Sequence, residues 1–246
     1  MATSFFIFFP ARSGSTFLVS LLSSHPDIHC EAEVFAVNFA GGQRSRLPQF
    51  ATELATRTFL DNLYSSARKA AGFKFKYPRQ YEMYPDVFNY LFERRAEVRC
   101  IILYRANLLK AAISKANQMR LRALGEPANL VQSNPAELAP LEVDLEWVVH
   151  SMTKIANNNA RCREIAQDFP QRLIITYEEL MTRPDVAGDT VCRFLQVPSY
   201  PLTADTRKIT SDSLPASVAN YRALVDRLRG TPFEVYLDEP PARAQL

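Results

Sequence analysis

Cysteine is scarce in this chain, and its four cysteines lie far apart at positions 30, 100, 162 and 192. None forms a CxxC pair, so the common zinc-site spacings are excluded and no disulfide framework is indicated. We therefore expect free thiols, as in a reducing cytoplasm.

Long hydrophobic runs are also missing. No stretch approaches the roughly 20 apolar residues that a membrane-spanning helix needs. The first apolar run, Phe5 to Phe9, has no basic leader and no small-residue cleavage site after it, unlike a signal peptide. The expectation is a soluble, cytoplasmic protein with no membrane anchor of its own.

Charge of one sign is weak as well. The formal net charge is +3 over 246 residues, too little to indicate a nucleic-acid partner but compatible with a local site for a small polyanion. Apolar content of 47% and charged content of 22% are ordinary for a globular protein. Without internal repeats or low-complexity tracts, residues 1–246 are expected to form a single domain, with a frayed tail at 239–246.

Apolar runs typical of buried parallel strands alternate with helical patterns along the chain. Strands are predicted at 5–9, 28–35, 72–77, 98–104 and 172–177, and helices at 16–24, 49–70, 85–95, 107–122, 144–168, from 184, and at 215–229. This alternation predicts an α/β fold, a central parallel sheet with helices on both faces. Residues 28–35 are expected beside the first strand, and residues 38–48 as a mobile polar loop.

The turn after the first strand carries the most chemistry. It supplies a cation, a flexible glycine, three hydroxyls and the backbone N–H groups of a helix start, in the order Arg12, Ser13, Gly14, Ser15, Thr16. Such a turn is suited to bind an anion such as phosphate. An ordinary strand-to-helix turn with a Ser/Thr cap fits these five residues equally well. The turn is not a Walker A loop, which requires GxxxxGK[ST].

Three segments together resemble the sulfotransferase family. Pro10 to Leu18 resembles its 5′-phosphosulfate loop. Arg105 at a strand end, with Ser114 nine residues later in the next helix, is similar to its 3′-phosphate motif, although many members have a spacing of eight. Ile175 to Leu180 is similar to its downstream strand-and-helix block. The overall pattern is closest to bacterial carbohydrate-type members, the group that includes nodulation-factor and lipopolysaccharide enzymes, and Phe17 replaces the tryptophan frequent in cytosolic aryl and steroid members.

The resemblance implies a P-loop-like three-layer fold and 3′-phosphoadenosine-5′-phosphosulfate (PAPS) as co-substrate, with no metal required. The implied reaction is transfer of the sulfuryl group to a hydroxyl of a carbohydrate or glycolipid acceptor. The residues implied to bind PAPS are Arg12, which is also the leaving-group cation, with Ser13, Gly14, Ser15, Thr16, Arg105, Ser114, Arg207 and Lys208. The alternatives are a P-loop-type nucleotide-dependent kinase and a non-catalytic nucleotide-binding domain.

The candidates for the general base lie in the segment after the first predicted helix. Glu33-Val34-Phe35 matches the Glu-apolar-Phe ending of the carbohydrate-type branch, so Glu33 is the predicted base. Glu31 and His29 stay open as alternatives, because in an extended segment Glu31 and Glu33 face the same side. A glutamate base would need a pKa raised by burial, which a nearby Arg12 would oppose.

Overall fold

The computed structural model describes residues 2–40, 43–125, 139–204 and 213–237. Contacts divide the chain into two compact units, Met1–Arg105 with Asn158–Thr206, and Ala106–Asn157 with Arg207–Leu246. Each unit is described by itself. The single-domain expectation stays a prediction, and the tail at 239–246 lies outside the described residues.

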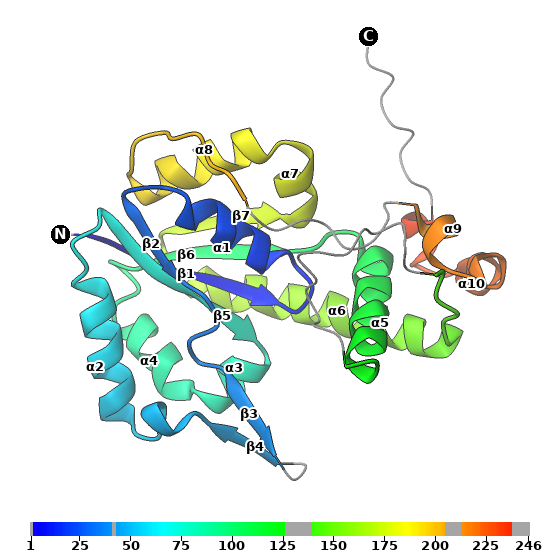
Figure 1. The fold of residues 1–246 in the computed structure, drawn as a ribbon, viewed down its shortest axis with the longest axis horizontal. Helices are drawn as coiled ribbons and strands as arrows, with labels where there is room; N and C mark the ends of the chain where they lie inside the picture. The colour runs from blue at the N-terminus through cyan, green and yellow to red at the C-terminus, as the bar shows by residue number, and fades with distance from the viewer. Residues whose placement is uncertain (1, 41–42, 126–138, 205–212, 238–246) are drawn as a thin grey trace. The chain divides into compact units, whose positions relative to one another are not determined.

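The first unit is built on a five-stranded parallel sheet (Figure 1). Its strand order is β2-β5-β1-β6-β7, with bounds Ile28–Glu31, Ala70–Tyr77, Thr3–Pro10, Arg99–Tyr104 and Arg172–Thr176. The predicted α/β class with a central parallel sheet is confirmed. The expectation that residues 28–35 lie beside the first strand is wrong, because β5 is inserted between β2 and β1 and pairs with both.

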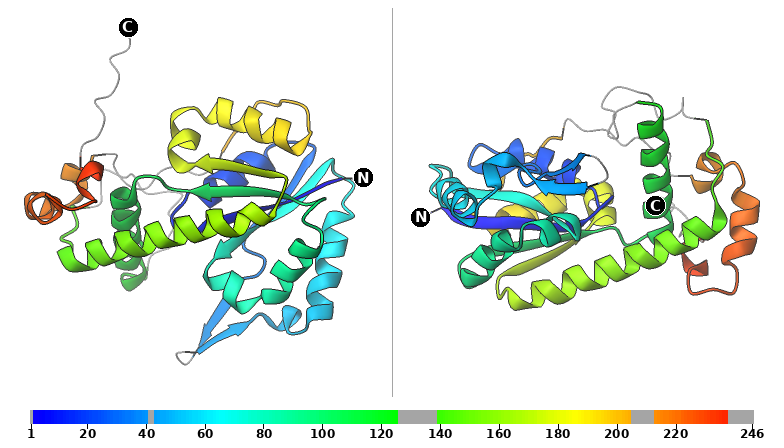
Figure 2. Two further views of the ribbon diagram at one scale, coloured as in Figure 1. Left: turned by 180° about the vertical axis from the view of Figure 1, so that it is seen from behind. Right: turned by 90° about the horizontal axis from the view of Figure 1, so that it is seen from below.

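Strand β1 is central because both of its faces are apolar. Phe6 and Phe8 face a core formed with α2 (Glu53–Tyr64), α4 (Pro85–Glu93) and the end of α6 (Leu145–Ile165). Phe5, Ile7 and Phe9 face a second core formed with α1 (Ser15–Ser23), α7 (Tyr177–Thr182) and α8 (Pro184–Leu195). The result is three layers, with helices on both faces of the sheet (Figures 1 and 2).

The carboxyl ends of four strands meet along one edge of the sheet. Pro10 of β1 lies beside Tyr77 of β5, and Tyr104 of β6 lies beside Thr176 of β7. In open parallel sheets, ligands bind outside this edge. The residues that follow β1, β6 and β7 are therefore brought to the place where a ligand is expected.

Residues 37–40 and 43–46 form two paired antiparallel strands in a segment that was expected to be a mobile loop. Strand β3 (Val37–Ala40) pairs with β4 (Gln43–Arg46). Arg46 anchors it, donating from Nε to the Met83 carbonyl at the end of α3 (Arg79–Met83) over 2.8 Å and pairing with Asp86. Short 3₁₀ turns occur at Pro48–Phe50, Ala166–Asp168 and Glu234–Tyr236.

The second unit is helical, with a core shared by α5 (Leu108–Ala123), the first part of α6, α9 (Leu214–Ser217) and α10 (Tyr221–Leu228). Asn107 caps α5, because its Oδ1 accepts a 2.8 Å hydrogen bond from the Lys110 N–H. The single helix predicted at 215–229 is two helices. Val218 between them is extended and bridges to Leu141 instead of continuing the helix.

Candidate active site

The turn between β1 and α1 contains two residues in the left-handed region. Arg12 has φ 67° and Gly14 has φ 85°. A left-handed backbone costs a non-glycine residue about 1 to 2 kcal/mol. The surrounding fold must therefore hold the backbone of Arg12 in this conformation. Left-handed residues build the backbone nests whose N–H groups bind anions. The helix that begins at Ser15 adds the favourable end of its dipole.

The hydroxyls of this turn lie in different environments. Ser13 is 1% exposed, and its Oγ has no hydrogen-bond partner among the described residues. Thr16 is exposed, and its Oγ1 accepts from Lys74 Nζ at 3.3 Å. A buried hydroxyl without a partner costs about 1 to 3 kcal/mol. The turn therefore fits a ligand that brings its own hydrogen-bonding atoms, as a phosphate does.

Tyr177 closes one side of the turn. A Cβ atom placed on Gly14 would lie 2.5 Å from Cδ2 of the Tyr177 ring. Tyr177 is the first residue of α7, and a capping box between Thr176 and Glu179 fixes that helix start directly after β7. Position 14 is thus confined to glycine twice, by its φ and by the ring against it.

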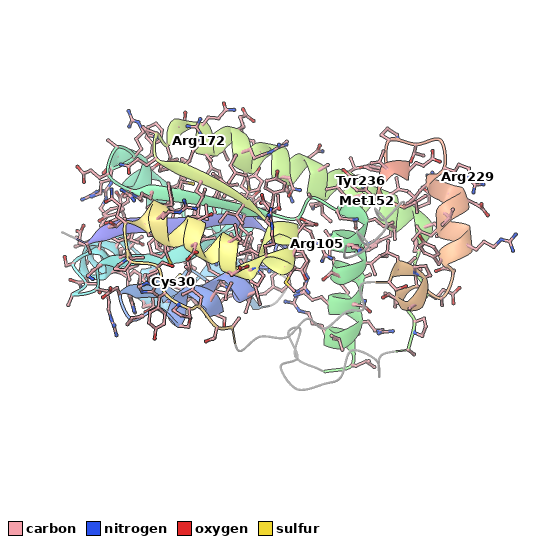
Figure 3. The ribbon with its side chains drawn as sticks, turned by 90° about the horizontal axis from the view of Figure 1, so that it is seen from above. Cys30, Arg105, Met152, Arg172, Arg229 and Tyr236 are labelled. Atoms are coloured by element: carbon pink, nitrogen blue, oxygen red, sulfur yellow. The ribbon has the colours of Figure 1, made fainter. Side chains whose placement is uncertain are left out.

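Arg105 lies over the same tyrosine from the end of β6. Its guanidinium carbon is 4.4 Å from the centroid of the Tyr177 ring, and its Nε is 3.9 Å from a carboxylate oxygen of Glu178. Asn159 Nδ2 donates to the Arg105 carbonyl at 3.0 Å, which fixes its backbone. Arg105 is 7% exposed, and burial lowers the pKa of its guanidinium. Figure 3 labels it near the start of α7. Its Nε has no hydrogen-bond partner among the described residues, as expected of a group that awaits an anion.

A second charged cluster connects the predicted base to the turn. Glu33 Oε2 lies 2.6 Å from Lys76 Nζ, and Glu33 Oε1 lies 3.6 Å from Lys74 Nζ. Both lysines come from β5, where they alternate with buried phenylalanines, and both ammonium groups lie within 6 Å of the Phe9 ring centroid, at 5.6 and 5.8 Å. Lys74 is 4% exposed and also contacts Thr16. The buried ammonium of Lys74 thus contacts both Thr16 of the turn and the carboxylate of Glu33.

The pKa of Glu33 is lowered, whereas a base tuned by burial would have it raised. Burial does act to raise it, but the charge and hydrogen bond of Lys76 and the nearby charge of Lys74 together outweigh burial. Burial lowers the pKa of Lys74, and the charge of Glu33 acts against that shift. Glu33 is therefore ionised at neutral pH, as a general base must be, but the raised pKa expected of a glutamate base is not found.

The comparisons with known proteins show the fold and not a sequence family. No family model matches, and no curated protein matches. A solved sulfotransferase from Alicyclobacillus acidocaldarius is similar over 97% of this chain and 100% of its own, with a TM-score of 0.54 and 18% identity. This chain has the sulfotransferase fold. Mouse sulfotransferase SULT7A1, solved with PAP, is similar at a TM-score of 0.47 and 14% identity, over 80% of this chain and 59% of its own.

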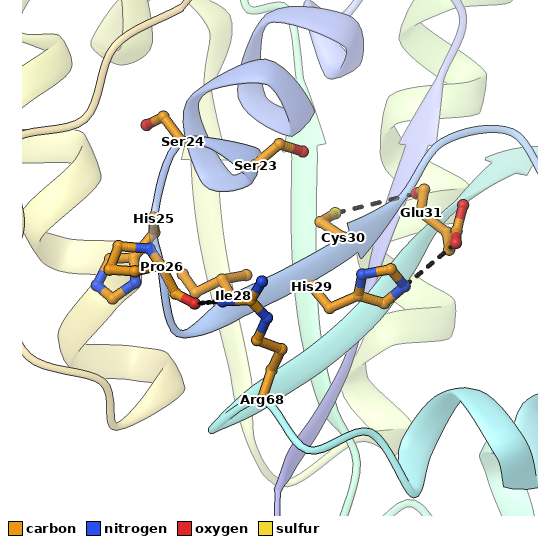
Figure 4. Close-up of a pocket in the computed structure, with 9 residues that line it drawn as sticks. All are labelled: Ser23, Ser24, His25, Pro26, Ile28, His29, Cys30, Glu31 and Arg68. Atoms are coloured by element: carbon orange, nitrogen blue, oxygen red, sulfur yellow. Dashed lines mark hydrogen bonds and ion pairs between the residues drawn. The ribbon is translucent and has the colours of Figure 1, made fainter.

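Within this sulfotransferase fold, the two alternative bases pair with each other. His29 Nε2 and Glu31 Oε1 lie 3.1 Å apart on the edge strand β2, where His29 is exposed and Glu31 is partly exposed. They line an open polar hollow of about 340 Å³ together with Arg68 and the end of α1 (Figure 4). Strand β2 ends at Glu31, so the alternation that would place Glu31 and Glu33 on one side does not continue.

The remaining residues predicted to bind PAPS are Ser114, Arg207 and Lys208. Ser114 is buried in α5 and belongs to the second compact unit, whereas Arg105 closes a segment of the first. Arg207 and Lys208 lie outside the described residues. The roles of these residues stay predictions.

Sequence reasoning missed three side chains of the candidate site. The alternation of Lys74 and Lys76 with phenylalanines predicts charges on a strand face, and Tyr177 is only part of the block from Ile175 to Leu180. One signal was available: lysines in a strand of otherwise buried residues are unusual, because lysine is almost never buried without a partner. The packing of Tyr177 on Gly14 joins positions far apart in the sequence, and no local pattern marks it.

Among the described residues, no group of three or more His, Cys, Asp or Glu side chains is arranged to hold a metal ion. No helix in the described ranges has both the length and the hydropathy to span a bilayer.

Proposed function

We propose that this chain transfers the sulfuryl group of PAPS to a hydroxyl of a carbohydrate or glycolipid acceptor. One observation carries the proposal: the buried ammonium of Lys74 contacts both Thr16 of the anion-binding turn and the carboxylate of Glu33. The Lys74 side chain thereby links the turn proposed to bind the phosphosulfate to the base proposed to take the acceptor proton. A sulfuryl transfer needs these two parts side by side.

The residues present fit PAPS at both of its charged ends. The turn from Arg12 to Thr16 offers left-handed backbone, an unpartnered buried hydroxyl and a helix start for the 5′-phosphosulfate. Arg105, with its unpartnered Nε, is our candidate for the 3′-phosphate, and Ser114, Arg207 and Lys208 are proposed to join it. Tyr177 would position both ends, because it contacts Gly14 and Arg105.

When bound, PAPS supplies a sulfuryl group on a phosphate leaving group. The chain's own residues have three tasks. Glu33 takes the proton of the acceptor hydroxyl as its oxygen forms the new bond to sulfur. Arg12 and Lys74 stabilise the negative charge that collects on the phosphate oxygen as its bond to sulfur breaks. Thr16 and Ser13 hold the phosphate in line with the acceptor.

The proposed acceptor class draws on two aromatic side chains at the carboxyl-end edge of the sheet. Tyr77 is the last residue of β5, and its ring centroid lies 5.6 Å from that of Tyr81. Both rings are half-buried and pack against the core of Phe8, whereas Lys76 lies by Phe9 on the other face of the sheet. We propose these partly exposed rings as candidates for stacking on the apolar face of a sugar.

Ligand binding gives the first test. Adenosine 3′,5′-bisphosphate (PAP) should raise the melting temperature by roughly 5 °C or more at about 100 times its Kd, whereas ATP with Mg²⁺ should not. Preferential stabilisation by ATP with Mg²⁺ would favour the kinase alternative and overturn our proposal.

Transfer of labelled sulfate from PAPS gives the second test. Glu33→Gln should lower the rate by about 10²- to 10⁴-fold, the usual contribution of a general base, and Arg12→Ala should also lower it strongly. Glu31→Gln and His29→Asn are the matched controls and should keep the rate. Loss in Glu31→Gln with full activity in Glu33→Gln would make Glu31 the base. PAP binding without transfer to any tested sugar or glycolipid would favour a non-catalytic domain.

A further inference from the structure

The two carboxylate oxygens of Glu33 are held differently. Oε2 accepts a short, 2.6 Å hydrogen bond from Lys76 Nζ. Oε1 lies 3.6 Å from Lys74 Nζ, which is within ion-pair range but longer than a hydrogen bond. The glutamate side chain is 37% exposed, so a substrate can approach it.

We propose that Lys76 is the positioning residue of the base: it anchors Oε2 of Glu33 and leaves Oε1 to receive the acceptor proton. This inference rests on the proposed role of Glu33. Lys76 itself touches neither PAPS nor the reacting atoms in this assignment. It acts through the glutamate, by fixing its rotamer and keeping it ionised.

The surroundings of Lys76 are suited to holding a side chain still. Its backbone N–H donates to Oε1 of Gln80 at 2.6 Å, and Gln80 is buried at the start of the next helix. Its ammonium lies 5.6 Å from the centroid of the Phe9 ring, which belongs to the neighbouring central strand. The backbone of Lys76 is thus held by a buried amide and its ammonium lies by a buried ring, so little freedom remains to be lost when the acceptor binds.

Lys74 cannot replace Lys76 in this role. Its ammonium is shared between Thr16 and Glu33 at 3.3 and 3.6 Å, so it is directed toward the anion-binding turn. A bound phosphosulfate would compete for that ammonium, whereas the short contact of Lys76 with Glu33 lies on the other carboxylate oxygen. In this proposal Lys74 acts on the donor, and Lys76 acts on the base.

The titration of Glu33 reports on this arrangement. The charged groups that act on its pKa are Lys76 and Lys74, both from β5. On β2, His29 and Glu31 are paired with each other. Arg12 lies on the turn that carries Thr16, the other contact of Lys74. Removing the Lys76 charge leaves burial and the longer Lys74 contact, so the pKa of Glu33 must rise.

The test is a carbon-13 NMR titration of glutamate side-chain carboxyls in the full chain, with the Glu33 signal assigned by Glu33→Gln. We expect its midpoint to move upward in both Lys76→Met and Lys76→Gln, and to stay near the wild-type midpoint in Lys76→Arg. Lys69→Met is the matched control, because Lys69 pairs with Asp27 on the surface and should leave Glu33 unchanged. Two uncharged variants keep the test valid if one fails to fold.

Kinetics supply the second readout. Lys76→Met should lower kcat by about 10- to 100-fold at unchanged PAP affinity, with its low-pH limb moved to higher pH, and Lys76→Arg should restore both. An unmoved Glu33 midpoint in both uncharged variants would overturn the inference, as would an equal loss of activity at every pH. If the wild-type chain transfers no sulfate at all, the proposed reaction fails, and the NMR titration alone decides whether Lys76 holds Glu33.

Discussion

The ring of Tyr177 occupies the space beside Gly14 that any larger residue would need. A Cβ at position 14 would lie 2.5 Å from Cδ2 of that ring, at a backbone φ of 85°. Strand β7 and the turn after β1 are therefore fitted to each other through one aromatic contact. This contact leads to the first of four predictions.

Gly14→Ala should destabilise the chain and abolish PAP binding. The left-handed backbone costs an alanine about 1 to 2 kcal/mol, and the clash with Tyr177 adds to it. Gly230→Ala is the matched control, because Gly230 also has a positive φ of 71° but nothing lies within 4 Å of a Cβ there. Urea unfolding should show the larger loss for Gly14→Ala. Equal losses would mean that the ring yields without cost.

Arg105→Ala should weaken PAP binding by about 10- to 150-fold. The estimate corresponds to the loss of a hydrogen bond to a charged group, worth about 1.5 to 3 kcal/mol. Arg163→Ala is the control, since Arg163 also lies over a tyrosine, 5.4 Å from the Tyr104 ring centroid, but on an exposed part of α6. Isothermal titration calorimetry with PAP measures both. Unchanged affinity in Arg105→Ala would remove Arg105 from the donor site.

The stability advantage of wild type over Glu33→Gln should disappear in acid. The pKa of Glu33 in the folded chain is lowered from its ordinary value of 4.5, so its contribution to stability is present above 4.5 and is lost as the pH falls through the lowered pKa. Urea unfolding of both proteins from pH 7 down to pH 3 measures the difference. A difference that grows on acidification would contradict the lysine contacts.

Arg46→Ala should cost about 3 to 5 kcal/mol of unfolding free energy. Arg46 pairs with Asp86, which is 6% exposed, and its removal leaves a buried carboxylate without its partner. Arg44→Ala on the same strand is the control and should cost less than about 1 kcal/mol, because Arg44 and Glu82 are exposed and 4.0 Å apart. Thermal or urea unfolding separates the two. Similar small losses would mean that the pair of strands β3 and β4 is not anchored through Arg46.

Much of the fold could be predicted because it depends on local patterns. The run from Phe5 to Phe9 is apolar on both faces, and this predicts a central strand whatever its neighbours are. Asn107 could be predicted as a cap from its position before an apolar helix pattern. The position of β2 could not be predicted, because strand order is decided by long-range pairing. The pairing of β3 with β4 was missed, since the residues of these strands are mostly polar and the two glycines in the sequence between them favour a loop.

The site was predictable to a similar extent. Arg12 through Thr16 could be found because an anion-binding turn is a contiguous motif. The low pKa of Glu33 could not, because it depends on Lys74 and Lys76, some forty residues away in sequence and beside it in space. The left-handed backbone of Arg12 is likewise set by its surroundings, since nothing in an arginine favours it.

Tyr177 has one further consequence. Its ring lies against the turn at Gly14 and under the guanidinium of Arg105. One aromatic side chain therefore borders both proposed phosphate sites. The freedom of that arginine is lost when the chain folds and not when a nucleotide arrives. A nucleotide with two phosphates then gains from both sites at once, whereas a monophosphate fragment can use only one. If the two proposed sites bind these phosphates, we expect this preorganisation in the unliganded protein to discriminate between the two ligands.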